Sequence, residues 1–153
     1  MTSFLDPIRN VRDRLCYTPP TPLSSDQSPL HWKRKIQLFL LNKEDFRRVG
    51  SRRSADIHTT ERQYIQQWPP MELQALRAQA LSGLYSYVIS EMRPEQVQAL
   101  SKRQLKAWDI FQTQTAVKLM SPEQVSYVKQ RFLPKYDHLI AHTIKEYEQK
   151  NSA

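Results

Sequence analysis

Two histidines and a glutamate near the carboxyl end of the chain have the spacing of a metal site. His138, His142 and Glu146 lie at i, i+4 and i+8, so a helix would place them on one face. That face lies opposite Ile140 and Ile144, and the other two histidines have no predictable relation to this pair. We therefore expect an exposed helix edge, and no metal or other cofactor is predicted.

Other reactive groups give no catalytic pattern. The single cysteine, Cys16, precedes a proline-rich stretch without a neighbouring histidine or cationic pocket to activate its thiol. No serine stands in a nucleophile elbow. Only two glycines occur, Gly50 and Gly83, which excludes phosphate-binding loops and dinucleotide fingerprints. The sequence therefore favours a non-enzymatic protein, and no catalytic residue is assigned.

Positive charge is concentrated in the first third of the chain. Residues 1–53 hold 11 Lys/Arg and 5 Asp/Glu, a balance of +6, whereas residues 54–153 hold 12 and 10, a balance of +2. Such a surface suits an acidic protein, nucleic acid or an anionic membrane, and phosphate contacts need only flexible cations. The candidate partner-binding or phosphate-binding residues are Lys33, Arg34, Lys35, Arg47, Arg48, Arg52 and Arg53.

One short string resembles a DNA-binding element. Leu100-Ser-Lys-Arg-Gln-Leu-Lys-Ala-Trp108 is similar to the start of a homeodomain recognition helix, where a Leu-Thr-x-Arg-Gln-x-Lys-x-Trp run occurs. The resemblance covers nine residues and then ends. The adenine-reading asparagine of that family falls on Phe111, and Asp109 puts a carboxylate where DNA would repel it. We therefore interpret Leu100, Leu105, Trp108 and Phe111 as core residues.

Three prolines each begin a segment with the same apolar pattern. Apolar residues follow Pro70, Pro94 and Pro122 at positions +3, +6, +11, +14 and +17. The prolines are 24 and 28 residues apart, which is a spacing found in helical repeat arrays. Helical periodicity of 3.6 residues produces similar offsets by itself. Both a duplication and independent helices therefore account for the pattern.

This pattern also predicts where helices begin and end. A helix of about six turns is expected from Pro70 to Ser90 or Met92, and Gly83 inside it would allow another helix to approach closely. Ser101 and Ser121 are predicted caps. Leu133-Pro134 should break or kink the last helix. The residues expected to be buried by this scaffold are Leu76, Leu84, Leu105, Trp108, Phe132 and Ile140.

The scarcity of glycine argues against β-hairpins, so the predicted fold is all-α. We expect a bundle of five to seven helices over 30–148, with an internal helical repeat as one form of it, and a frayed end at 149–153. Near its start, Trp32, Ile36, Phe39 and Leu40 have helical spacing and are expected to face the core. Asn42 and Asp45 form a predicted capping box.

Residues 1–29 are predicted to form a separate unit. A short amphipathic helix places Phe4, Ile8, Val11 and Leu15 on one face, suited to docking in a partner's groove. A linker follows that holds four of the ten prolines. The same arm would also serve as the secretion signal of a bacterial effector or as a mitochondrial presequence.

The sequence therefore predicts a helical protein-interaction module, such as an adaptor, assembly or regulatory factor. Its expected partner is a protein with an acidic surface. Two alternatives stay open, a nucleic-acid-binding protein that uses segment 33–53 and a secreted effector. No transmembrane segment is predicted, since the apolar runs are short. A soluble intracellular location, cytoplasmic or nuclear, follows, while the oligomeric state and the partner's identity stay undetermined.

Overall fold

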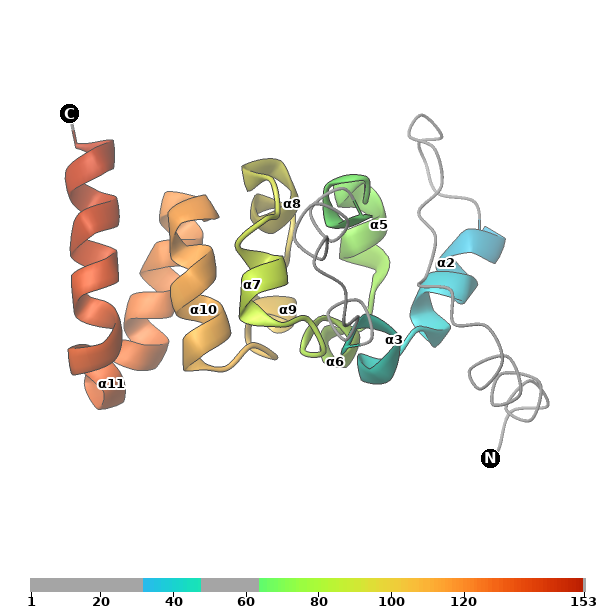
Figure 1. Ribbon diagram of the computed structural model, residues 1–153, viewed down its shortest axis with the longest axis horizontal. Coiled ribbons are helices and arrows are strands. Elements are labelled where there is room, and N and C mark those ends of the chain that lie inside the picture. The colour runs from blue at the N-terminus through green and yellow to red at the C-terminus, as the bar shows by residue number, and fades with distance from the viewer. Residues whose placement is uncertain (1–31, 48–63, 153) are drawn as a thin grey trace, which may run out of the picture.

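The computed structural model describes residues 32–47 and 64–152, and all regular structure in these stretches is helical. This finding confirms the all-α class. Figure 1 shows the helices standing side by side in an elongated row, with α2 near one end and α11 at the other. Besides the helical residues 64–66, the described stretches hold nine α-helices and one 3-10 helix, more than the predicted five to seven. Most of them have only one or two turns.

The helices stack in successive layers. The chain begins with α2 (Trp32–Leu40) and α3 (Lys43–Arg47), followed by α5 (Pro70–Ala75), α6 (Ala78–Leu81) and α7 (Ser86–Ile89). The next layer holds α8 (Pro94–Gln98), α9 (Lys102–Leu105), α10 (Ile110–Ala116) and the 3-10 helix η2 (Val117–Leu119), and α11 (Pro122–Asn151) closes the stack. Helix α2 packs on α5 and α5 on α8, while α3 packs on α6 and α6 on α9. Helix α10 packs on both α7 and α11.

The single helix predicted from Pro70 to Met92 is wrong. The chain forms three short helices there, because Arg77 and Tyr85 adopt extended backbone with ψ of 146° and 151°. Both residues lie directly before a new helix. No proline or glycine stands at the Arg77 break, whereas Gly83 lies two residues before Tyr85 at the second one. Contacts with the following layer end these helices, and they override the local helix preference.

Four buried glutamines supply those contacts. Each lies three residues after an extended residue, and its side-chain oxygen accepts a hydrogen bond from that residue's backbone N–H, at 2.8–3.1 Å. Each side-chain NH₂ group donates to carbonyls 24–31 residues earlier in the chain. The pairings are Gln96 with Ile65 and Trp68, Gln104 with Leu73, Gln74 and Leu76, Gln112 with Ser82 and Leu84, and Gln124 with Val97 and Leu100.

One amide therefore caps the start of its own helix and the end of a helix in the preceding layer. Carbonyls at helix ends have no partner within the helix, and leaving them buried without a donor is costly. Trp108 adds a further contact of this kind, since its Nε1 donates to the Leu81 carbonyl at 3.0 Å. What recurs along the stack is therefore a pattern of hydrogen bonds and helix starts. A duplication of the sequence stays a hypothesis.

Helix α11 turns back on itself. The Tyr147 hydroxyl donates to the Met120 carbonyl at 2.9 Å, and Lys129 pairs with Glu148. A straight helix would separate Lys129 and Glu148 by about 28 Å, at 1.5 Å per residue. Pro134 lies between these two residues, and proline removes a hydrogen bond of the helix ladder. The predicted break or kink at Leu133-Pro134 is confirmed.

The core contains all six side chains that the sequence assigned to it, with Leu76, Leu84, Leu105, Trp108, Phe132 and Ile140 each at most 5% exposed. Gly83 lies between α6 and α7 and not inside a long helix, but the close approach of another helix that was expected there is present. A Cβ atom there would lie 2.0 Å from the Lys43 carbonyl oxygen, so the absence of a side chain lets α3 approach. The capping box predicted at Asn42 is present, with Asp45 Oδ2 accepting from the Asn42 N–H at 2.8 Å.

Two predictions about the core are wrong. Phe111 is 60% exposed, because α10 begins only one residue earlier and directs Gln112 and Thr113 inward instead. On α2, Leu38 is the buried residue, and the predicted core face is exposed. The helix packs on α5 through its other side, and the Arg34 guanidinium reaches into that contact to pair with Glu72.

Candidate partner-binding groove

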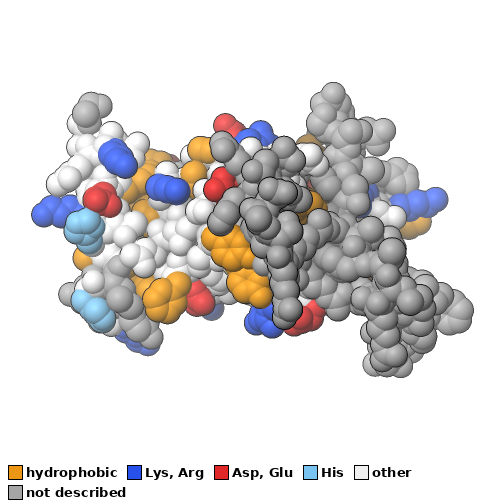
Figure 2. Space-filling view, in the orientation of Figure 1, with side chains coloured by type: hydrophobic (Ala, Val, Ile, Leu, Met, Phe, Trp, Pro, Cys, Tyr) orange, Lys and Arg blue, Asp and Glu red, His pale blue; other side chains and the backbone are white. Residues whose placement is uncertain are grey.

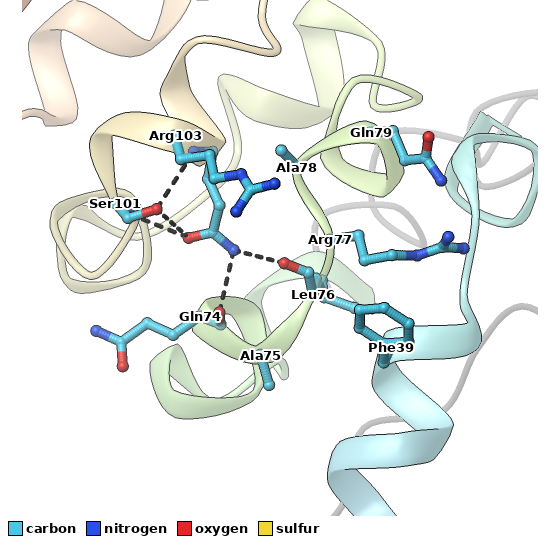
Figure 3. A pocket seen from close by; sticks show the side chains of 10 residues that line it. Phe39, Gln74, Ala75, Leu76, Arg77, Ala78, Gln79, Ser101 and Arg103 are labelled. Carbon is cyan, nitrogen blue, oxygen red and sulfur yellow. Dashed lines mark hydrogen bonds between the residues drawn. The ribbon is translucent and has the colours of Figure 1, made fainter.

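A groove with a volume of about 560 Å³ lies where α2, the α5–α6 turn and α9 meet. Its described lining contains two arginines and no aspartate or glutamate. The lining residues are Phe39, Gln74, Ala75, Leu76, Arg77, Ala78, Gln79, Ser101, Arg103 and Gln104. They come from segments far apart in the sequence, and the Gln104 amide holds two of these segments together (Figure 3). The groove is therefore built by the same contact that shapes the fold.

Arg77 connects the groove to α2. Its guanidinium carbon lies 5.1 Å from the centre of the Phe39 ring, and Nη2 donates to the Leu41 carbonyl at 3.2 Å. Its buried Nε has no hydrogen-bond partner among the described residues. Figure 3 shows Arg103 extending from α9 toward the same opening. The guanidinium groups create a positive site beside an exposed aromatic ring, and guanidinium is well suited to carboxylates and phosphates.

A second pocket of about 420 Å³ occupies the equivalent place one step further along the stack. It lies between α3, the α6–α7 turn and the start of α10, with Lys43 and Arg47 on one side. The carboxylate of Asp109 lies in this lining and accepts from the Gln112 N–H at 2.8 Å. Arg47 also pairs with Glu44 at 3.4 Å. The second pocket is therefore less suited to an anion than the groove.

The histidine pair lies on the outer surface. His138, His142 and Glu146 are all exposed on α11, as expected, and Figure 2 shows histidine side chains at that end of the molecule. His142 Nδ1 lies 3.8 Å from the Glu146 carboxylate. Within residues 32–47 and 64–152, no three histidine, cysteine, aspartate or glutamate side chains are grouped to hold a metal ion.

The described candidate basic residues differ in their exposure. Arg34 donates to both Glu72 oxygens, at 2.7 and 3.2 Å, and only 14% of its side chain is exposed. It therefore has a structural role. Lys33 and Lys35 are exposed on α2, and Lys33 lies 5.6 Å from the Trp32 ring centre. The candidates Arg48, Arg52 and Arg53 lie outside the described residues.

The predicted docking helix with Phe4, Ile8, Val11 and Leu15 also lies outside the described residues. Sequence reasoning missed Arg77 and Arg103 as site residues. Arg103 stands in the string that resembles a recognition helix, but its neighbours in the groove come from positions 39 and 74–79. The sequence signal for how these segments meet was a glutamine three residues after a predicted helix cap. Gln104 has this place after Ser101, and Gln124 has it after Ser121.

Comparison of the chain with known protein families, with curated proteins and with solved structures finds no match. No helix in the described stretches is long and apolar enough to cross a membrane. The site is therefore interpreted from its own geometry and charge.

Proposed function

We propose that the protein is a non-enzymatic helical scaffold that binds a protein partner through the groove between α2, the α5–α6 turn and α9. The observation that carries this proposal is the composition of the groove, with Arg77, Arg103 and the exposed Phe39 ring and no carboxylate in its described lining. Arginine and aromatic side chains are the residue types enriched at the energetic centres of protein interfaces. The partner's contribution is an acidic surface.

The polar groups of the groove support binding over catalysis. The Ser101 hydroxyl accepts from the Gln104 N–H at 3.2 Å, and the Gln104 amide donates to the Leu73 and Leu76 carbonyls at 2.8 and 2.9 Å. Both side chains are therefore engaged in holding the fold. The remaining polar atoms belong to arginines and to two exposed glutamines, which recognise and orient a ligand without activating a nucleophile.

The decisive experiment reverses one charge in the groove. The Arg103 side chain is exposed and forms no hydrogen bond or ion pair with the described residues, so Arg103→Glu should not disturb folding. Proteins that co-purify with the full-length chain from native cells, with and without nuclease, identify the partner. Its dissociation constant is then measured for both forms. We expect Arg103→Glu to weaken binding about tenfold, or about 1.4 kcal/mol, because a carboxylate would repel the partner's acidic groups.

The matched control is Lys118→Glu, which makes the same charge change at an exposed residue of η2 outside the groove. It should change the dissociation constant less than about twofold, because separated surface charges are screened by salt. Equal effects of the two variants would contradict the groove as the binding site. Loss of all co-purifying material on nuclease treatment would support nucleic-acid binding instead.

A further inference from the structure

The outward face of α2 is apolar. Trp32, Ile36, Phe39 and Leu40 are 61%, 50%, 58% and 51% exposed, whereas Leu38 on the opposite side is fully buried. They occupy positions i, i+4, i+7 and i+8, so they form one continuous stripe along the helix. The stripe runs over about 12 Å, at 1.5 Å per residue. An exposed apolar surface of this kind marks an interaction site.

The position of α2 in the stack indicates what shape would cover this stripe. Helix α2 packs on α5 and α5 packs on α8, so α2 is the first described helix of this row (Figure 1). In helical arrays each unit buries its apolar side against the next, and terminal units normally present a polar outer face. An apolar outer face on the first described helix of a row therefore fits one further helix, packed as α2 itself packs on α5.

The charges on α2 indicate the chemistry of that further helix. Its sequence, Trp-Lys-Arg-Lys-Ile-Gln-Leu-Phe-Leu, has no acidic residue; Arg34 pairs with Glu72 on the inner side, and the two exposed cations are Lys33 and Lys35. A second copy of α2 placed against the first would bring like charges together, which costs free energy at an interface. A helix bordered by glutamate or aspartate would instead pair with exposed lysines such as Lys35.

We infer that the α2 stripe binds an acidic amphipathic helix of the protein partner. The inference rests on the proposed function and extends its site. Phe39 belongs both to the stripe and to the lining of the groove, and the Arg77 guanidinium lies over its ring. A helix with apolar residues at i, i+3, i+4 and i+7 would cover Ile36 and Leu40. Its acidic border would then reach Lys35 at one side and Arg77 and Arg103 at the other.

The test identifies the occupant directly. A photo-crosslinking amino acid replaces Leu40 in the full-length chain in native cells, and the attached peptide is sequenced after irradiation. The control carries the same amino acid in place of Phe111, which is exposed to a similar extent (60%) on α10 and lies outside the groove. We expect position 40, and not position 111, to attach to a partner segment with the acidic amphipathic pattern.

Several results would overturn the inference. One kind of result is that position 40 attaches to a different occupant: a second copy of the chain, residues 1–31 of the same chain, lipid, or a partner segment without acidic residues. The other kind is that positions 40 and 111 attach equally, or that neither attaches to anything. Binding measurements separate this inference from the proposed function. Leu40→Ser should raise the dissociation constant of the partner about tenfold, as expected when an apolar anchor is removed, and Phe111→Ser should leave it unchanged. If Arg103→Glu weakens binding but Leu40→Ser does not, the groove is supported as the binding site and the inference of a partner helix on the α2 stripe is wrong.

Discussion

Glu72 on α5 and Gln104 on α9 occupy the same position within their own short helices, but their side chains make opposite kinds of hydrogen bond. Each is the third residue of a short helix that follows an extended residue, and each is at least 95% buried. The Gln104 amide donates to carbonyls of the preceding layer. The Glu72 carboxylate has no proton to donate, so it accepts two hydrogen bonds from Arg34 on α2.

The comparison explains why α2 is attached to its neighbour by an ion pair, whereas the inner layers are joined by amide hydrogen bonds. An amide at this position joins one layer to the carbonyls of the layer before it, without any charge. A carboxylate needs a cation from the neighbouring element, and Arg34 supplies it at 2.7 Å. Helix α2 is therefore attached to the stack by a charged pair and exposes its apolar face outward. The side-chain group at this position therefore decides whether the neighbouring segment contributes carbonyls, as for Gln104, or a cation, as for Glu72.

The largest effect should follow from placing the first layer's carboxylate in the second layer. Gln104→Glu would direct a buried negative charge at the carbonyl oxygens of Leu73, Gln74 and Leu76. We expect a loss of about 3–5 kcal/mol in the free energy of unfolding, as for a buried charge without a partner. Urea unfolding at neutral pH measures it. Gln130→Glu, at an exposed site on α11, should cost less than about 0.5 kcal/mol, and equal losses would contradict the role of the amide.

The reverse exchange should have a smaller effect. Glu72→Gln keeps an oxygen that can accept from Arg34 but removes the charge that balances the guanidinium. We expect a loss of about 1–3 kcal/mol, because the remaining partner is a largely buried cation. The same urea titration applies. Glu95→Gln is the control, since the 4.0 Å contact of Glu95 with Arg93 joins two exposed side chains and is worth little. A neutral result for Glu72→Gln would show that the charge does not hold α2.

Local sequence signals were sufficient for helix starts and for much of the core. The caps at Asn42, Ser101 and Ser121 depend on side chains within three residues, and each was placed correctly. The kink near Pro134 likewise follows from the chemistry of one residue. The buried positions of Leu76 and Trp108 follow from periodicity, because apolar residues must face some core whichever helices they belong to.

Features that depend on partners distant in the chain could not be read in the same way. The helix break at Arg77 arises because Gln104 takes the Leu73 and Leu76 carbonyls from about 30 residues away. The exposure of Phe39 depends on which side of α2 meets α5, and that choice follows the Arg34–Glu72 pair. The groove combines both effects, so no local motif marks it.

The smallest predicted effect concerns the end of the stack, where a hydroxyl caps a carbonyl in place of an amide. Burial, and then the negative charge of Glu123, raise the pKa of Tyr147 above its ordinary value of 10.0. Its hydroxyl donates to the Met120 carbonyl at 2.9 Å only while it is protonated. The unfolded chain ionises first as the pH rises. The stabilisation is therefore complete below pH 10 and is lost as the pH rises through the folded pKa.

Tyr147→Phe tests this dependence. At pH 8 the variant should unfold with about 0.5–1.5 kcal/mol less free energy than the natural chain, because the Met120 carbonyl loses its donor. The difference should shrink as the pH approaches 11, since only the natural chain loses stabilisation in that range. Urea titrations at both pH values measure it, with Tyr85→Phe at a site that is 39% exposed as the control. A difference that stays constant with pH would mean that Tyr147 contributes through packing alone, and that the hydroxyl cap differs in kind from the amide caps of the inner layers.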